Sequence, residues 1–315
     1  MRAVVTGCAG FIGSHLADRL IADKWTVIGL DSLAPTYDSV RRRRHIDWLA
    51  QSPMFEFIEG DLNSIDLKEV VGSADVVFHL AARPGVRASW RDFRQVSDDN
   101  IRATQRVLDA ITDNPETRLV FASSSSVYGV VDSFPVSEST VLRPISPYGV
   151  TKAASESLVT AYAAQFDLAA TSLRYFTVYG PRQRSDMAFN RWIRAALLSQ
   201  PLHVFGDGKV IRDFTYVDDV VEASVLAGTA TSTGHQIYNV AGGSPASVNE
   251  ILTGISELLE TDLKIEYSDP ARGDPPRTGG DTKLIESDLG WHPRTALRDG
   301  LEAQVGWLRA IIGSR

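Results

Sequence analysis

Tyr148 and Lys152 are the residues of this sequence whose types and spacing best support a chemical reaction. They lie in the segment Ser146–Lys152, four positions apart, and on a helix this spacing places both side chains on one face. A phenol normally loses its proton at about pH 10, and a neighbouring ammonium group favours the phenolate. The pair is therefore a candidate general base for a sugar or alcohol hydroxyl at neutral pH. Ordinary helix surfaces also carry this spacing, so the rest of the sequence has to decide whether the two residues form a catalytic pair.

Four consecutive serines, Ser123–Ser126, lie upstream of this pair and follow the apolar run Leu119–Ala122, which predicts a buried strand. Serines in loops often bond only to nearby backbone. In open α/β sheets, however, ligands bind at the carboxyl ends of parallel strands. We therefore interpret this serine run as part of a substrate site.

A glycine-rich loop near the N-terminus has the spacing of a phosphate-binding turn. An apolar strand runs into Gly7–Gly13, and an amphipathic helix follows to about Ala22. Gly7 would permit the tight turn, Gly10 the close approach of a pyrophosphate, and Gly13 the packing of helix on strand. The phosphates would lie at the helix N-terminus, where amides and dipole favour negative charge. A plain strand–helix turn without a ligand is the alternative.

Two acidic residues follow the next strands. Asp31 ends the apolar strand Thr26–Leu30 and is placed to accept hydrogen bonds from the adenosine ribose hydroxyls. It would repel a 2′-phosphate, so the pattern predicts NAD rather than NADP. Asp61 follows the strand Phe55–Ile58 and is a candidate for the adenine amine, with an ordinary turn aspartate as the alternative.

The elements that must position these residues alternate between strand and helix, which predicts an α/β fold with a doubly wound parallel sheet of Rossmann type. Further strands are expected at 74–80, 119–123, 170–176 and 236–240, and a helix from Tyr148 to about Phe166. The alternation then loosens into a smaller C-terminal α/β domain that binds substrate. We expect a helix near 187–199, a strand at 203–205, another helix that starts with the segment Arg212–Asp219, a helix at 248–259 and two short final helices. The predicted domains are 1–176 with about 213–240, and 177–212 with 241–315.

Composition excludes several functional classes. The 315 residues include 43% hydrophobic residues, enough for a sizeable core, and the net charge of -7 argues against a nucleic-acid binder. The basic run Arg41–Arg44 is interpreted as a solvated helix face, with a role near a nucleotide as the alternative. The single cysteine, Cys8, allows no internal disulfide and fits the cytoplasm. We expect no leader and no membrane span. The histidines lack ligand-like spacing, so no metal is predicted.

In this order and spacing, the motifs resemble the extended short-chain dehydrogenase/reductase family of NAD-dependent nucleotide-sugar epimerases and dehydratases. The resemblance covers essentially the whole chain and rests on Thr6–Gly13, Asp31, His79–Ala82, Ser123–Gly129, Tyr148 with Lys152, Arg174–Phe176 and Arg212–Asp219. It implies a Rossmann domain holding NAD and a small domain that closes over the sugar nucleotide. It also implies a homodimer formed through the segments 100–112 and 148–166.

The same resemblance implies roles for individual residues. Ser124 would be catalytic with Tyr148 and Lys152. The cofactor contacts would be Gly7, Gly10, Phe11, Ile12, Gly13, Asp31, Asp61, Leu62, Leu80, Ala81, Ala82, Ser123, Tyr148, Lys152 and Tyr175. Arg212 and Arg272 would bind the diphosphate, with Arg87 and Arg184 as weaker candidates that surface ion pairs would equally explain. Phe205 would pack on uracil or simply in the core, and Asp274 would bond the uridine ribose.

Within the family, the sequence is most similar to UDP-glucuronic acid 4-epimerases. The likeness rests on Pro84–Trp90, Ser146–Lys152, Arg174–Arg184 and Asp186–Phe189. Dehydratases and uronate decarboxylases of the family carry an acid where this chain has Ser125 and Ser126, so elimination lacks its proton shuttle. Thr177 stands where many neutral-sugar epimerases have Asn. With Ser124, Ser125 and Ser126, it is a candidate to hold the sugar carboxylate.

The resemblance implies 4-epimerisation of UDP-glucuronate to UDP-galacturonate through a transient 4-keto sugar, without net redox change. The alternatives are the same chemistry on UDP-glucose and UDP-galactose, or decarboxylation of UDP-glucuronate to a UDP-pentose. A non-catalytic NAD-binding regulator is an alternative of a different class, because fold does not determine function.

Overall fold

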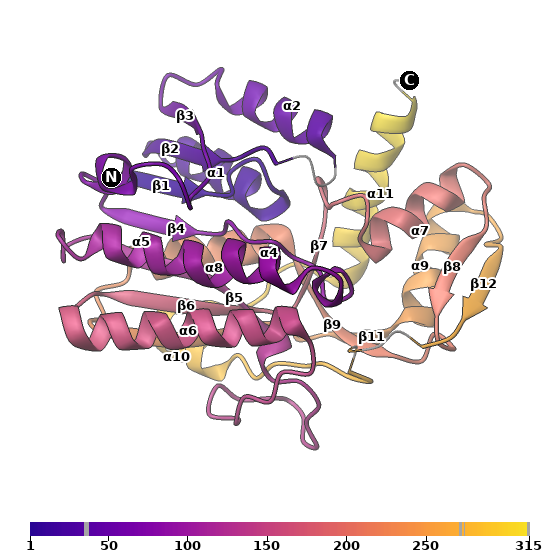
Figure 1. Ribbon diagram of the computed structural model, residues 1–315. Coiled ribbons are helices and arrows are strands. Elements are labelled where there is room, and N and C mark those ends of the chain that lie inside the picture. The colour runs from indigo at the N-terminus through magenta and orange to yellow at the C-terminus, as the bar shows by residue number, and fades with distance from the viewer. Residues whose placement is uncertain (35–37, 271–272, 274, 314–315) are drawn as a thin grey trace.

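The computed structural model describes residues 1–34, 38–270, 273 and 275–313 (Figure 1). Its centre is a seven-stranded sheet in the order β10-β6-β5-β4-β1-β2-β3, in which every pairing is parallel. The strands are β1 (Arg2–Thr6), β2 (Thr26–Asp31), β3 (Phe55–Glu59), β4 (Val76–His79), β5 (Arg118–Ser124), β6 (Ala170–Tyr175) and β10 (His235–Val240). The strand order reverses direction between β1 and β4, as in a doubly wound fold, which confirms the predicted fold class.

Helices cover both faces of this sheet. They are α1 (Phe11–Ala22), α2 (Ser39–Leu49), α3 (Leu67–Val71), α4 (Phe93–Ser97), α5 (Ala103–Ile111), α6 (Pro147–Phe166) and α8 (Val217–Thr229). Successive strand side chains point to opposite faces, so Ala3 and Val5 pack in one core and Val4 in the other. The first core takes side chains from α1, α2 and α8, and the second from α3, α5 and α6.

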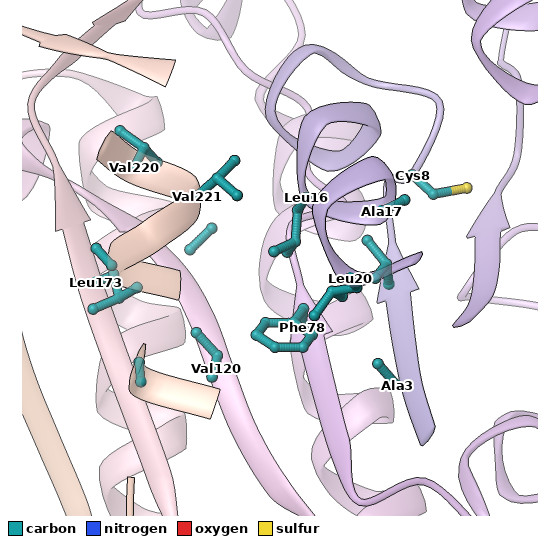
Figure 2. Close-up of a cluster of buried hydrophobic side chains, with 14 of the residues drawn as sticks. Ala3, Cys8, Leu16, Ala17, Leu20, Phe78, Val120, Leu173, Val220 and Val221 are labelled. Atoms are coloured by element: carbon teal, nitrogen blue, oxygen red, sulfur yellow. The ribbon is translucent and has the colours of Figure 1, made fainter. Parts of the chain in front are cut away.

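The core between α1, α8 and the sheet is built from large aliphatic and aromatic side chains. Figure 2 shows Leu16 and Leu20 of α1 above Phe78 of β4, with Val220 and Val221 of α8 nearby. These five residues are buried. The apolar side chains on one face of α1 and α8 thus pack against the alternate strand side chains that point to the same face of the sheet.

A smaller unit follows the large sheet and lies to the right in Figure 1. It has a three-stranded sheet, β11-β9-β7, and a parallel pair, β12-β8. Its own core contains side chains of α7, α9 and α11. The bounds are β7 (Thr177–Tyr179), α7 (Ala188–Leu197), β8 (Leu202–Phe205), β9 (Ile211–Tyr216), β11 (Pro245–Ser247), α9 (Val248–Leu259), β12 (Ile265–Ser268), α10 (Lys283–Leu289) and α11 (Leu297–Gly313). Ile285 of α10 packs in the core of the large sheet.

Two predicted elements were wrong. The segment from Arg212 to Tyr216 was expected to begin a helix, but it forms most of strand β9, because it pairs with β7 and β11. Helix α8 begins only at Val217, and two acids in its first turn favour that start. The second final helix, α11, is not short but runs for 17 residues, with Leu301 and Leu308 of its apolar face buried in the smaller core.

Candidate active site

A cavity of about 1000 Å³ opens where the strands of the large sheet end, facing the smaller unit. Among the residues expected at the cofactor, its lining contains Gly7, Gly10, Phe11, Ile12, Gly13, Asp31, Asp61, Leu62, Leu80, Ala81, Ala82, Ser123 and Tyr175. Among those expected at the reacting sugar, it contains Ser124, Ser125, Ser126, Tyr148, Lys152, Thr177 and Arg184. The structure therefore brings together, at one site, residues that are as far apart in the sequence as Gly7 and Arg184.

The glycine loop leaves no room for larger residues at two positions. Gly7 has φ of +74°, and a Cβ there would lie 2.8 Å from the Ala81 nitrogen. A Cβ on Gly13 would lie 2.2 Å from the Gly7 oxygen. Gly10 begins α1 without a side-chain cap, and the first turn of α1 holds no acidic residue. The helix N-terminus thus presents amides and no competing negative charge, as a bound dinucleotide diphosphate requires.

Asp31 is held at the end of β2 by donors on both carboxylate oxygens. Oδ1 accepts from the Leu33 amide at 2.9 Å, and Oδ2 accepts from the Ala9 amide at 3.1 Å. The Ala9 contact ties β2 to the glycine loop. Asp31 also forms an ion pair with Arg42 of α2, and Arg42 lines the cavity. The interpretation of the basic run as purely a solvated helix face was therefore wrong for Arg42, whose side chain is only 12% exposed.

Helix α6 begins where local chemistry requires it. The Ser146 side chain accepts a hydrogen bond from the Gly149 amide at 3.1 Å, and proline occupies the first turn. The Tyr148 amide donates to Ser89 Oγ at 3.1 Å. One turn later, the Lys152 ammonium donates to the Ala122 carbonyl of β5 at 2.7 Å and lies 4.8 Å from the Phe121 ring centroid.

Lys152 is a buried cation with few polar neighbours. Only 3% of the residue is exposed, and burial lowers the pKa of its ammonium group to about 7. Desolvation penalises the charged form, while the single carbonyl offsets only part of that cost. An anionic partner, such as a phenolate, would favour the ammonium form here.

The serines at the end of β5 form a tight turn. Ser124 Oγ accepts from the Ser126 amide at 3.2 Å and donates to Ser126 Oγ at 3.1 Å. Ser125–Val127 is a single 3-10 turn that follows β5. The Ser123 hydroxyl instead turns inward and donates to Glu156 Oε2 at 2.8 Å. Three neutral hydroxyls, on Ser124, Ser125 and Ser126, therefore line the cavity without an acidic residue among them.

Three predicted substrate residues lie apart from this lining, and a fourth, Arg184, is part of it. The Arg87 guanidinium lies over the Phe205 ring, 3.8 Å from its centroid, and so joins the loop after β4 to β8 of the smaller unit. Arg212 in β9 donates to the Ile211 carbonyl at 2.7 Å. The side chains of Arg87, Phe205 and Arg212 are therefore not part of the cavity lining. Arg272 and Asp274 lie outside the described residues. Arg184 lines the cavity and forms two hydrogen bonds to the Asp186 carboxylate, at 2.9 and 2.8 Å.

Several cavity residues were missed by the sequence analysis. Asn63 lies beside Asp61, and the Arg83–Asp99 ion pair, at 2.6 Å, lines the wall after β4. Asn63 and Arg83 each lie just beyond a strand end, which was the signal that could have identified them, whereas Asp99 lies in the helical segment Asp98–Arg102 and carries no such signal. Within the described part of the chain, no group of three or more His, Cys, Asp or Glu residues could hold a metal ion. No helix in that part is both long and apolar enough to cross a membrane.

A family model described as the NAD dependent epimerase/dehydratase family matches residues 3–241. The chain belongs to this family. It is 41% identical to "Uncharacterized UDP-glucose epimerase YtcB" of Bacillus subtilis, over 99% of each chain. It is 38% identical to the UDP-glucuronic acid 4-epimerase of Bacillus cereus, solved with UDP-glucuronic acid and NAD, with a TM-score of 0.95 over 99% of this chain and 100% of that one.

A second solved relative, MoeE5, shares 41% identity and a TM-score of 0.90, over 99% of this chain and 100% of that one. It was solved with NAD and UDP-glucuronic acid, and also with NAD and UDP-glucose. For a member of the NAD dependent epimerase/dehydratase family, the glycine loop, Asp31 and the open N-terminus of α1 fit NAD. The glycine loop and the N-terminus of α1 would therefore hold its diphosphate, and Asp31 would bond its adenosine ribose.

The cofactor half of the site can be tested at Gly13. In Gly13→Ala, the added methyl would press on the Gly7 backbone and push the loop out of place, so affinity for NAD should fall by about 10- to 100-fold. Calorimetric titration of nucleotide-free protein with NAD measures this. Gly306→Ala in α11 is the matched control, because its Cβ meets no atom within 4 Å and should leave affinity unchanged. Equal affinities in the two variants would contradict the proposed loop geometry.

The lowered pKa of Lys152 predicts a pH-dependent stability difference. The folded protein binds the lysine proton less tightly than the unfolded chain, so this group opposes folding below about pH 7, and that penalty fades as pH rises toward 10. Lys152→Met removes the penalty. In nucleotide-free protein, its melting temperature relative to wild type should therefore be higher at about pH 6 than at about pH 9.

Thermal unfolding at the two pH values measures that difference. The control is Lys283→Met, at a lysine whose side chain is 88% exposed, and its offset from wild type should be the same at both. An offset for Lys152→Met that does not change with pH would show that the lysine is not desolvated.

Proposed function

We propose that this chain catalyses the 4-epimerisation of UDP-glucuronic acid to UDP-galacturonic acid, with NAD as a tightly held cofactor and no net redox change. One observation carries this proposal: the Tyr148–Lys152 pair shares a cavity with the hydroxyls of Ser124–Ser126 and Thr177, and the serine turn contains no acid. The 38% identical Bacillus cereus enzyme, which carries that name and was solved with UDP-glucuronic acid and NAD, supports it.

In this mechanism, Tyr148 and Ser124 act on the oxygen of the sugar 4-hydroxyl. Tyr148 as phenolate removes the hydroxyl proton, and Ser124 donates a hydrogen bond to the oxygen as it becomes a carbonyl. Lys152 stabilises the phenolate and would bind the ribose next to the nicotinamide. The glycine loop and Asp31 would hold NAD beside this oxygen, and the chemistry that it would supply is reversible hydride exchange with carbon 4, on one face of the sugar before the keto sugar turns and on the other face afterwards. Tyr148 then gives back its proton.

The sugar carboxylate creates a hazard that a neutral sugar lacks. The 4-keto intermediate is a β-keto acid, and it loses carbon dioxide when the bond to the carboxyl group aligns with the carbonyl π system. Ser125, Ser126 and Thr177 can donate hydrogen bonds to the carboxylate and hold it out of that alignment. Neutral donors suit this task because the carboxylate has to move with the ring when it turns.

The rest of the substrate site follows the predicted division of the chain. Residues 1–176 with about 213–240 would bind NAD, and residues 177–212 with 241–315 would bind the sugar nucleotide. Arg212, Arg87 and Phe205 remain candidates for the diphosphate and uracil, together with Arg272 and Asp274. Closure of the smaller unit over the substrate would bring Arg87 and Phe205, which already contact each other, toward the cavity.

A specific observation favours a second candidate, the epimerisation of UDP-glucose and UDP-galactose. The Bacillus subtilis relative carries the name of a UDP-glucose epimerase, and MoeE5 was solved with UDP-glucose as well as UDP-glucuronic acid. Both reactions use the same Tyr148, Lys152 and Ser124, so they differ only in what Ser125, Ser126 and Thr177 contribute.

Product analysis by NMR separates these reactions. Purified protein is incubated with UDP-glucuronate, or with UDP-glucose, and no added cofactor. We expect UDP-galacturonate from the first and at least about tenfold slower turnover of the second, because it lacks the carboxylate contacts. Tyr148→Phe should lower turnover by about 100- to 10,000-fold and keep its NAD. Faster turnover of UDP-glucose would favour the second candidate, and a UDP-pentose product would make the chain a decarboxylase.

We further propose that the chain is a cytoplasmic homodimer whose interface includes α6. Val150, Ala154, Leu158 and Ala161 follow helical spacing along this helix, and Val150 is 43% exposed. Helix α5 runs beside α6 on the near face in Figure 1, so the two could form a four-helix bundle with a second copy.

Light scattering after size exclusion tests the dimer. Wild type should have twice the mass of one chain, and Ala161→Arg should be monomeric, because it places a charge within the apolar stripe. Ala303→Arg is the control, since Ala303 is an exposed alanine on α11 and not on the helices of the proposed interface. A monomeric wild type, or equal effects of both variants, would contradict this interface.

A further inference from the structure

A buried ion pair lies beneath the serine turn. Glu156 of α6 and Arg174 of β6 are each only 3% exposed. Arg174 Nη2 pairs with Glu156 Oε1, and Arg174 Nε donates to Glu156 Oε2 at 3.1 Å. The guanidinium therefore contacts both oxygens of the carboxylate, which is the strongest and most directional arrangement that these two groups can adopt.

Each member of this pair also holds one end of the serine turn. Ser123, just before the turn, donates from Oγ to Glu156 Oε2 at 2.8 Å. Tyr128, just after it, accepts at its hydroxyl from Arg174 Nη1 at 2.8 Å. The ion pair thus spans the base of the segment that carries Ser124, Ser125 and Ser126.

The same pair sets the register of α6 against β5. Tyr148, Lys152 and Glu156 follow one another at four-residue intervals, so they share one face of the helix. Lys152 bonds to the carbonyl of Ala122, and Glu156 accepts from the side chain of the next residue, Ser123. Two successive turns of the helix are therefore fastened to two successive residues of the strand. This double contact determines how far Tyr148 lies from the serine turn.

The network around the pair is closed. Tyr128 donates to Asn239 Oδ1 at 2.7 Å, and Asn239 Nδ2 donates to the Val136 carbonyl at 2.8 Å. Among the described residues, no polar side-chain atom of Glu156, Arg174, Tyr128 or Asn239 is buried without a partner. A buried ion pair gives little net stability compared with apolar packing, but it permits only one geometry. Here the ion pair holds Ser124, Ser125 and Ser126 in a fixed position.

We propose that Glu156 and Arg174 are positioning residues that fix the serine turn against Tyr148 and Lys152 and thereby keep the 4-keto uronate from decarboxylating. This inference rests on the proposed function. In the side reaction, the bond between carbon 5 and the carboxyl carbon breaks, carbon dioxide leaves, and the electron pair passes into the enolate of the 4-ketone. Carbon 5 then takes a proton from solvent, and the hydride removed earlier returns to carbon 4, which yields a UDP-pentose.

The test is Glu156→Gln in the NAD-loaded enzyme. Glutamine keeps the size of the side chain but cannot accept from both the Arg174 fork and Ser123 as a carboxylate does. We expect kcat for epimerisation to fall by about 10- to 100-fold, with KM changed by less than about threefold. We also expect the ratio of UDP-pentose to UDP-galacturonate to rise by at least about tenfold, measured by NMR.

Val159→Ala is the matched control, because Val159 is fully buried on the same helix and packs only in the apolar core. It should lower the melting temperature as a cavity does, and leave the product ratio unchanged. If Glu156→Gln and Val159→Ala give the same product ratio and the same kcat at comparable loss of melting temperature, the pair is structural only and the proposal is overturned.

Ser123→Ala keeps the test decisive if Glu156→Gln does not fold. It removes one hydroxyl from the network and leaves both charges paired. Measured on the NAD-loaded variant, it should raise the pentose fraction in the same direction, and a clean product would overturn the proposal. If wild type converts only UDP-glucose and UDP-galactose, the proposed function fails. The positioning role is then still tested by comparing kcat of Glu156→Gln with kcat of Val159→Ala on those two sugar nucleotides.

Discussion

The packing of α6 on β5 is the constraint on which the rest of the active site depends. A buried ammonium group, Lys152, has to reach a strand carbonyl, and a buried carboxylate, Glu156, has to reach the next residue of that strand. Neither charge tolerates a shift of the helix, because each would lose its partner within the protein interior. Tyr148, the proposed general base, lies one turn before Lys152 on the same face, so its position follows from theirs. A site that moves protons to and from one oxygen requires this degree of order.

A second constraint acts on the cofactor half, and it is steric rather than electrostatic. The Gly7 and Gly13 backbones lie where any side chain would collide with neighbouring main chain. This close packing brings β1, α1 and the segment after β4 together, and it aims the N-terminus of α1 at the cavity. Asp31 then ties the loop to β2 through the Ala9 amide. The two halves thus meet at the ends of adjacent parallel strands, where backbone direction alone makes ligand binding favourable.

The features that could be predicted from the sequence are those with local causes. The strands and helices of the large sheet, the glycine loop and the Tyr148–Lys152 spacing each depend on residues close together in the chain. Strand β9 was missed because its partners, β7 and β11, are remote or antiparallel to it. The role of Arg42 depends on α2 folding back toward Asp31, and that of Glu156 on a strand segment 18 residues away. Arg87, Phe205 and Arg212 are not part of the cavity lining, and the contact of Arg87 with Phe205 depends on packing between remote segments, which no local pattern encodes.

The charge distribution at the sugar end of the cavity argues for a substrate that has to move while bound. Arg184 lies in the lining, but Asp186 contacts two of its nitrogens, so a carboxylate there would meet little net positive charge. A strong cationic clamp would bind a uronate more tightly in its starting position, and that same attraction would raise the barrier to turning the ring. The hydroxyls of the serine turn and Thr177 can exchange hydrogen bonds as the carboxylate rotates. In the proposed reaction, a site built this way holds the carboxylate by geometry rather than by charge, and for that reason it depends on a rigid base beneath the turn.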